Sequence, residues 1–178
     1  MNQVKQGDLD KMGLLFERHN RPLFGFFYQM TRQGDVSEDL VQTVFYRMLK
    51  YRKNFRGQGK FTTWMYHIAR NVLTDHRKKN KSLQYTDEYA TWEERLSDGI
   101  TIETSIQAKE DQELLKHAMG KLSPEKREIL VLSKFQKMKH EEIGELLGCK
   151  SGAVKVRVFR ALQDLKNIFN RLTKETQP

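Results

Sequence analysis

Cysteine, proline and long apolar runs are scarce in this chain. It has one cysteine and three prolines among 178 residues, and no apolar stretch approaches the roughly 20 residues that cross a bilayer. The start of the chain, MNQVKQGDLDKM, also lacks the apolar centre of a signal peptide. Cys149 has no second cysteine with which to form an internal disulfide. We therefore expect a soluble, cytoplasmic protein with no direct insertion into a membrane.

Sequence signatures of catalysis are missing as well. The chain contains no P-loop, no G-x-S-x-G and no H-E-x-x-H pattern. Its five histidines are scattered, and Cys149 is too isolated to join a metal cluster. We expect a protein that is not an enzyme and that uses no cofactor, metal or small-molecule substrate. A nuclease or other nucleic-acid enzyme would instead show a metal-dependent activity that is lost when carboxylates are mutated.

Acidic residues are the minority, and their distribution is uneven. The chain has 32 Lys and Arg against 23 Asp and Glu, a net charge of +9, and a pI near 9.6. Residues 82–111 hold eight acidic and two basic residues, a net charge of −6, which leaves +15 for the rest of the chain. Two basic blocks therefore flank an acidic connector. This pattern favours two small domains and a polyanionic partner.

The most informative segment, His140–Leu165, has the pattern of a helix-turn-helix. Ile143, Leu146 and Leu147 give its first helix an apolar stripe. Gly144 is a small residue at which a partner helix could cross closely, and Gly148 suits the left-handed conformation that ends a helix. Ser151 can cap the second helix. Cys149, in the turn, is expected to be a small buried apolar residue.

The second helix of this motif has two different faces. Its apolar face repeats at three and four residues through Val154, Val158, Ala161, Leu165, Ile168 and Leu172. Its opposite face would present Lys155, Arg157, Phe159 and Arg160 to a groove of DNA. The alternative is an ordinary helical hairpin whose basic face is simply solvated.

The N-terminal block is predicted to be entirely helical. The first stretch contains Leu9 to Phe16, and Pro22 is expected to kink it or to open a new helix after Asn20. Gly34 breaks the apolar segment that follows, and Asp35 with Glu38 resembles a capping box. Two more helices follow at helical spacing, over residues 35–50 and 61–81.

A basic, glycine-containing loop at residues 51–60 joins these two helices. Its cations could hold phosphates while an aromatic and a polar side chain accept an unstacked base, through Arg52, Asn54, Phe55 and Arg56. The alternative is that Phe55, Phe61, Trp64 and Tyr66 are core aromatics and that the charges are solvated.

Taken in order, four segments of the chain resemble bacterial RNA polymerase sigma factors of the sigma-70 family, in the extracytoplasmic-function (ECF) branch. These segments are GDVSEDLVQTVFYRMLKYRKNF, FTTWMYHIARNVLTDHRKK, LSPEKREILVLSKFQKMKHEEIGELLG and AVKVRVFRALQDLK. The resemblance implies an all-α fold with sigma domain 2 at residues 8–80 and sigma domain 4, with its helix-turn-helix, at residues 112–172. A flexible acidic linker at residues 81–111 would join them. Such a linker would be threaded toward the RNA exit path of the polymerase, or would be a plain solvated tether.

The resemblance also implies a role for individual residues. The polymerase-binding helix would place Asp39, Leu40, Gln42 and Thr43 against the clamp helices of the core enzyme. The loop would capture a flipped base of the minus-ten element, and the helix after it would face the nontemplate strand through Tyr66, Arg70, Asn71 and Thr74. The minus-thirty-five reader would use Ser151, Lys155, Arg157, Phe159 and Arg160.

These resemblances predict a promoter-specificity subunit that binds core RNA polymerase and promoter DNA, and they suggest an anti-sigma factor as a further partner. Three positions depart from the family pattern. Lys150 and Ala153 stand where serine and threonine are common, and Val156 replaces a small polar residue. The promoter sequence that is read could therefore differ from that of relatives. A stand-alone helix-turn-helix regulator, which binds DNA without polymerase, is the alternative function.

Overall fold

The computed structural model describes residues 1–57, 59–81 and 106–176, and within these ranges the chain is helical, without strands. The predicted linker therefore lies mostly outside the described residues. The N-terminal bundle consists of α1 (Asn2–Lys5), α2 (Lys11–Thr31), α3 (Gly34–Lys50), the 3-10 turn η1 (Arg52–Asn54) and α4 (Phe61–Lys81). The C-terminal bundle consists of α5 (Ile106–Lys121), α6 (Pro124–Leu130), the π-helical turn η2 (Val131–Phe135), α7 (His140–Leu147) and α8 (Ser151–Thr176).

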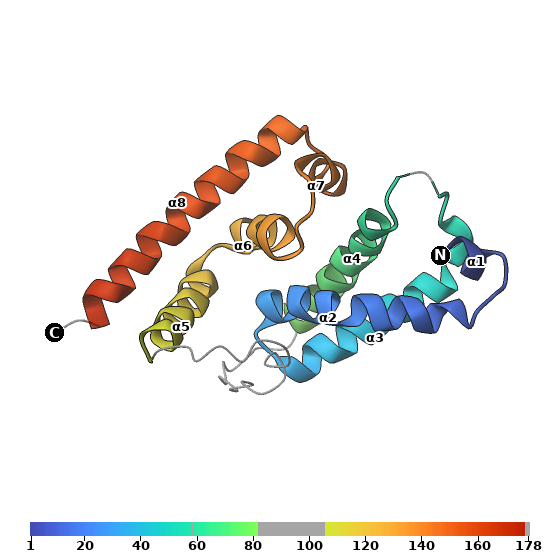
Figure 1. Ribbon diagram of the computed structural model, residues 1–178, viewed down its shortest axis with the longest axis horizontal. Helices are drawn as coiled ribbons and strands as arrows, with labels where there is room; N and C mark the ends of the chain where they lie inside the picture. The colour runs from blue at the N-terminus through green and yellow to red at the C-terminus, as the bar shows by residue number, and fades with distance from the viewer. Residues whose placement is uncertain (58, 82–105, 177–178) are drawn as a thin grey trace.

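The N-terminal bundle is built from three long helices that pack side by side (Figure 1). Helix α2 continues through Pro22 as one helix, so the new start considered after Asn20 is not found. The proline is exposed, and the residues that follow it are among the most deeply buried of the chain, which fixes this half of the helix against the core. These residues are Leu23, Phe26, Phe27 and Met30.

The junction between α2 and α3 depends on side chains other than those expected. Arg32 ends α2 in a left-handed conformation, with φ 61°. Helix α3 begins at Gly34 with Gln33 as its N-cap, so Asp35 lies inside the helix and not at the cap position that we expected for it. Instead the buried hydroxyl of Ser37 donates to the carbonyl of Gln33 at 2.6 Å. This bond fixes the start of α3.

The C-terminal bundle places α8 along the outer edge of the molecule, against α5, α6 and α7 (Figure 1). Ser123 caps α6, and Pro124 occupies its first position, where the missing N–H costs nothing. Helix α5 begins at Ile106, inside the range predicted as linker. Buried apolar residues of both bundles belong to one continuous cluster, which includes Phe26 and Val72 on one side and Leu132 and Ile143 on the other. The all-helical, two-domain architecture is confirmed.

Candidate nucleic-acid interface

The turn of the helix-turn-helix is fixed by two glycines at the end of α7. Gly148 adopts the left-handed conformation, with φ 66° and ψ 38°, as predicted. The amide of Cys149 then donates to the carbonyl of Gly144 at 2.9 Å. A Cβ at Gly144 would lie 2.5 Å from the carbonyl oxygen of Cys149. The close neighbour of Gly144 is therefore this turn, and not a crossing helix as we had expected.

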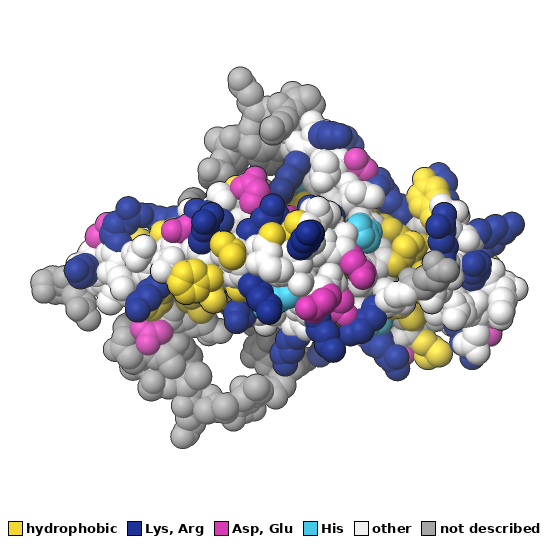
Figure 2. Space-filling model, turned by 90° about the horizontal axis from the view of Figure 1, so that it is seen from above, with side chains coloured by type: hydrophobic (Ala, Val, Ile, Leu, Met, Phe, Trp, Pro, Cys, Tyr) yellow, Lys and Arg dark blue, Asp and Glu magenta, His cyan; other side chains and the backbone are white. Residues whose placement is uncertain are grey.

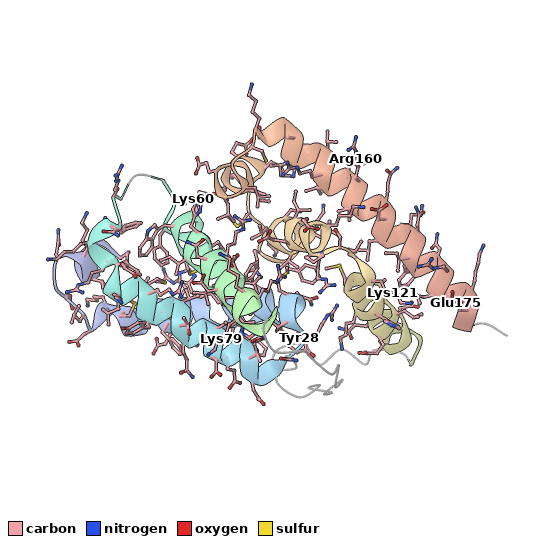
Figure 3. The ribbon with its side chains drawn as sticks, turned by 180° about the vertical axis from the view of Figure 1, so that it is seen from behind. Tyr28, Lys60, Lys79, Lys121, Arg160 and Glu175 are labelled. Atoms are coloured by element: carbon pink, nitrogen blue, oxygen red, sulfur yellow. The ribbon has the colours of Figure 1, made fainter. Side chains whose placement is uncertain are left out.

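Helix α8 leaves the turn with its basic face open to solvent. Its inner positions Val154, Val158 and Ala161 are buried against the bundle. The predicted contacts Lys155, Arg157, Phe159 and Arg160 are all exposed, and Ser151 is half-buried at the first turn. Arg160 extends outward from α8 in Figure 3. Figure 2 shows Lys and Arg side chains spread over the face seen from above, with apolar side chains between them.

The basic loop is supported from beneath by an aromatic cluster. Phe55 is only 6% exposed, and its ring lies 5.2 Å from Trp64 and 6.1 Å from Phe61 between centroids. In this conformation Phe55 has no open ring face on which a base could stack. Phe55 is therefore a core aromatic, which is the alternative given above, and not a base-binding residue. Asn54 and Arg56 are exposed.

Two further contacts hold this loop in place. The guanidinium of Arg52 donates to the carbonyl of Leu49 at 3.0 Å and so closes the end of α3. On the other side, Lys5 Nζ donates to the carbonyl of Phe55 at 2.7 Å. Val4, next to it in α1, is fully buried. The first turn of the chain is therefore part of the structure that carries the loop.

Helix α4 directs its predicted DNA-facing residues to two different environments. Asn71 and Thr74 are exposed, and the Thr74 hydroxyl donates to the carbonyl of Arg70 at 2.9 Å. Tyr66 is buried, and its hydroxyl donates to Gln136 Oε1 at 2.6 Å. Burial raises the pKa of that hydroxyl, so it remains a proton donor at neutral pH.

Arg70 makes the second link between the bundles. Its guanidinium contacts the carboxylate of Glu128, with Nε 2.7 Å from Oε1, and donates through Nη1 to the carbonyl of Leu146 at 2.8 Å. The amide of Gln136 also donates to the carbonyl of Pro22 at 3.2 Å. One face of α4 is therefore covered by the C-terminal bundle.

Lys60 and Glu142 form a third link, at the end of the basic loop. Lys60 Nζ lies 2.5 Å from Glu142 Oε1, and Figure 3 places Lys60 at the start of α4. The other carboxylate oxygen of Glu142 accepts the N–H of Lys139 at 2.9 Å, at the beginning of α7. Burial alone would raise the pKa of Glu142. The bonds from Lys60 and from the Lys139 amide outweigh burial, and the pKa lies below its ordinary value.

The predicted polymerase-binding residues share helix α3 but not one surface. Asp39 and Gln42 are exposed, and Thr43 is half-buried with its hydroxyl donating to the carbonyl of Asp39 at 2.8 Å. Leu40 is 6% exposed and belongs to the core. Of these four residues, Asp39 and Gln42 therefore lie on the open surface of α3, with Tyr46 one turn further along at 63% exposed.

Several residues of this interface were not found from the sequence. Glu128 and Gln136 bind residues of α4 that lie 58 and 70 positions away, and no local pattern indicates such a pairing. Lys5 and Val4 belong to a four-residue helix, which is too short to show periodicity. The one available signal was Val4 itself, the one apolar side chain among residues 2–8.

Within the described ranges, no group of three or more His, Cys, Asp or Glu side chains could hold a metal ion. The helices of the same ranges include none that combines the length and apolarity needed to cross a membrane.

Comparison with known proteins gives consistent matches to both bundles. A family model described as Sigma-70 region 2 matches residues 15–83, and one described as Sigma-70, region 4 matches residues 112–165. The RNA polymerase sigma factor CarQ of Myxococcus xanthus is 31% identical over 178 residues, with 98% of each chain covered. The ECF RNA polymerase sigma factor SigW of Bacillus subtilis is 28% identical, with 93% of this chain and 92% of the relative covered.

Solved structures match the fold. CnrH in complex with the cytosolic domain of CnrY gives a TM-score of 0.72 at 21% identity, covering 96% of this chain and 94% of that one. The sigma factor RpoE in complex with the anti-sigma factor NepR from Bartonella quintana gives 0.67 at 24% identity, covering 89% and 96%.

Proposed function

This chain belongs to the sigma-70 family of bacterial RNA polymerase sigma factors, in its ECF branch, and from that premise we propose a role for each of its surfaces. The exposed residues of α3, with Asp39 foremost, bind core RNA polymerase. The loop at residues 51–60 and the adjoining face of α4 bind the minus-ten element. Helix α8 reads the minus-thirty-five element in duplex DNA, with residues 8–80 and 112–172 acting as separate promoter-binding domains.

One observation carries this proposal: the exposed basic face at the start of α8 follows directly from a turn with helix-turn-helix geometry. In such motifs the N-terminal residues of the second helix contact base edges. Lys155, Arg157 and Arg160 supply charge for phosphates and donors for bases, and Asn54 and Arg56 supply the same chemistry at the loop.

The mechanism requires no catalytic side chain. The factor docks on duplex DNA through α8 and makes strand opening favourable by holding an unpaired base, which offsets an unstacking cost of about a few kcal/mol. The protein acts in the cytoplasm, where core polymerase and promoter DNA are found, and is not an enzyme. An anti-sigma factor is a further partner, supported by the complexes of CnrH with CnrY and of RpoE with NepR.

Because one face of α4 is covered by the C-terminal bundle, we propose that the bundles separate before this face binds DNA. Tyr66 and Arg70 contact the C-terminal bundle through Gln136, Glu128 and the carbonyl of Leu146. They reach nontemplate-strand DNA only after the two bundles separate. Core polymerase, by binding α3 and holding the two bundles at separate positions on the promoter, supplies the free energy for that separation.

Run-off transcription with reconstituted core polymerase tests the function. The chain should direct initiation from promoters that the same holoenzyme selects from random DNA, and no promoter-dependent stimulation would refute the proposal. Charge reversal by Asp39→Lys should weaken binding to core polymerase and leave duplex DNA binding by the free chain unchanged. A stand-alone helix-turn-helix regulator would instead bind its site equally well with and without polymerase, and Asp39→Lys would have no effect.

A further inference from the structure

Val156 is an apolar side chain at the centre of a polar, DNA-facing helix surface. It is 49% exposed, whereas Val154 and Val158 of the same helix are buried. Its exposure follows from helix geometry, because residues advance by about 100° each and Val156 lies almost opposite the buried row. No packing within the described structure explains why a valine stands here.

The residues around Val156 indicate which kind of binding partner would fit this face of α8. Phe159 and Arg160 lie three and four residues further on and therefore share its face of α8. Phe159 is 60% exposed, and Lys155 and Arg160 are also exposed. An apolar centre with cations at its edge fits a surface that is apolar in the middle and anionic at the rim. The major groove of DNA offers this combination wherever a thymine methyl lies between two phosphate backbones.

We propose that Val156 is a specificity-determining residue, which selects thymine at one position of the minus-thirty-five element by contact with the thymine C5-methyl group. This inference rests on the proposed reading of duplex DNA by α8 and adds the chemical group that is read. Val156 has no hydrogen-bonding side chain, so it cannot read a base through donors or acceptors, and the methyl is the apolar feature of the groove.

The position of Val156 in the helix supports this assignment. It is the sixth residue of α8, within the first two turns after Gly148 and Cys149. This is the part of a recognition helix that reaches base edges, while later turns move away from the groove. Gln163 lies on the same exposed face two turns further along and provides a matched control.

Replacing thymine by uracil removes only the methyl group and so isolates the proposed contact. We would place uracil singly at each thymine of the minus-thirty-five element in a promoter selected by the reconstituted holoenzyme, and measure duplex binding. At one position uracil should weaken binding about fourfold, the equivalent of about 0.8 kcal/mol for one buried methyl. With Val156→Ala the same substitution should change binding less than about twofold.

The control variant and the outcomes that would overturn the inference about Val156 can be told apart. Gln163→Ala should retain the full sensitivity to uracil. If no thymine shows that sensitivity, or if Val156→Ala leaves it intact, the inference is overturned while promoter-directed transcription still stands. If the holoenzyme selects no promoter at all, the proposed function itself fails before this test begins. Circular dichroism of Val156→Ala, which changes an exposed residue, should match that of the unaltered chain.

Discussion

The guanidinium of Arg70 contacts the Glu128 carboxylate at 2.7 Å, across the boundary between the two bundles. Arg70 is also a residue proposed to bind nontemplate-strand DNA. Because a single guanidinium cannot hold both partners in the same fork geometry, the ion pair and the DNA compete. Replacement of the carboxylate partner therefore tests whether the covered face of α4 limits access to DNA.

Glu128→Gln should weaken the contact between the bundles and increase binding of the free chain to forked minus-ten DNA several-fold. The substitution removes a charge that is only 17% exposed, while Arg70 remains available for phosphate. Fluorescence anisotropy with a labelled fork measures the affinity. Asp164→Asn is the matched control, because Asp164 pairs with Lys126 inside the C-terminal bundle. Equal affinities for the unaltered chain and Glu128→Gln would show that separation of the bundles does not limit DNA access.

Gly144→Ala should destabilise the turn by about 1–3 kcal/mol, because the new Cβ would lie 2.5 Å from a backbone oxygen that cannot move without distorting Cys149. Urea unfolding measures the loss, and duplex binding through α8 should fall with it. Gly152→Ala provides the comparison, since its added Cβ meets nothing within 4 Å. Its stability should change by less than about 1 kcal/mol. Similar losses for both variants would contradict the close approach at Gly144.

Acid should weaken the contact between Lys60 and Glu142. The pKa of Glu142 in the folded chain lies below its ordinary value of 4.5, so the carboxylate contributes stability that is fully present above that pH. This contribution is lost as the pH falls below 4.5 and through the lowered pKa. Unfolding measured between pH 7 and pH 3 should show a smaller acid-dependent loss for Glu142→Gln than for the unaltered chain. Parallel curves for the two proteins would refute this linkage.

Lys60→Met separates the two roles of Glu142 in that experiment. It removes the ion pair and keeps the 2.9 Å bond from the Lys139 amide that begins α7. The acid-dependent loss for Lys60→Met should therefore lie between those of the other two proteins.

Arg160→Ala should weaken duplex binding by about 1 to 3 kcal/mol if Arg160 makes a bidentate contact to guanine. Arg160 is exposed on α8 and extends away from the bundle, so its loss should leave unfolding unchanged (Figure 3). Binding assays on the selected promoter and on variants with single base changes separate base reading from phosphate contact. Unchanged affinity together with unchanged sequence preference would place Arg160 outside the interface.

The sequence predicted those parts of the molecule that depend on local patterns. The left-handed turn at Gly148, the buried row of α8 and the helical N-terminal block follow from spacing and from backbone preference, and all of them are found. The new helix considered after Asn20 is not found, because the packing of Leu23 and Phe26 on the core outweighs the loss of one backbone donor at Pro22.

Long-range contacts lay beyond sequence reasoning. The family resemblance assigned Tyr66 and Arg70 to a DNA-facing side of α4, yet both are held by residues of the other bundle. Phe55 satisfied the composition of a base pocket but packs beneath the loop against Trp64. The environment of Tyr66 and Arg70 is set by partners that are distant in sequence, and that of Phe55 is set by how the aromatic rings pack. Periodicity in the sequence carries no information about either.

The attachment of Lys5 to the carbonyl of Phe55 has a practical consequence for work on this protein. Because Val4 is fully buried beside that bond, an affinity tag fused ahead of Met1 would lie next to the loop at residues 51–60, which is proposed to open promoters. The same proximity makes the amino terminus a good place for an environment-sensitive dye, whose emission would follow melting in real time.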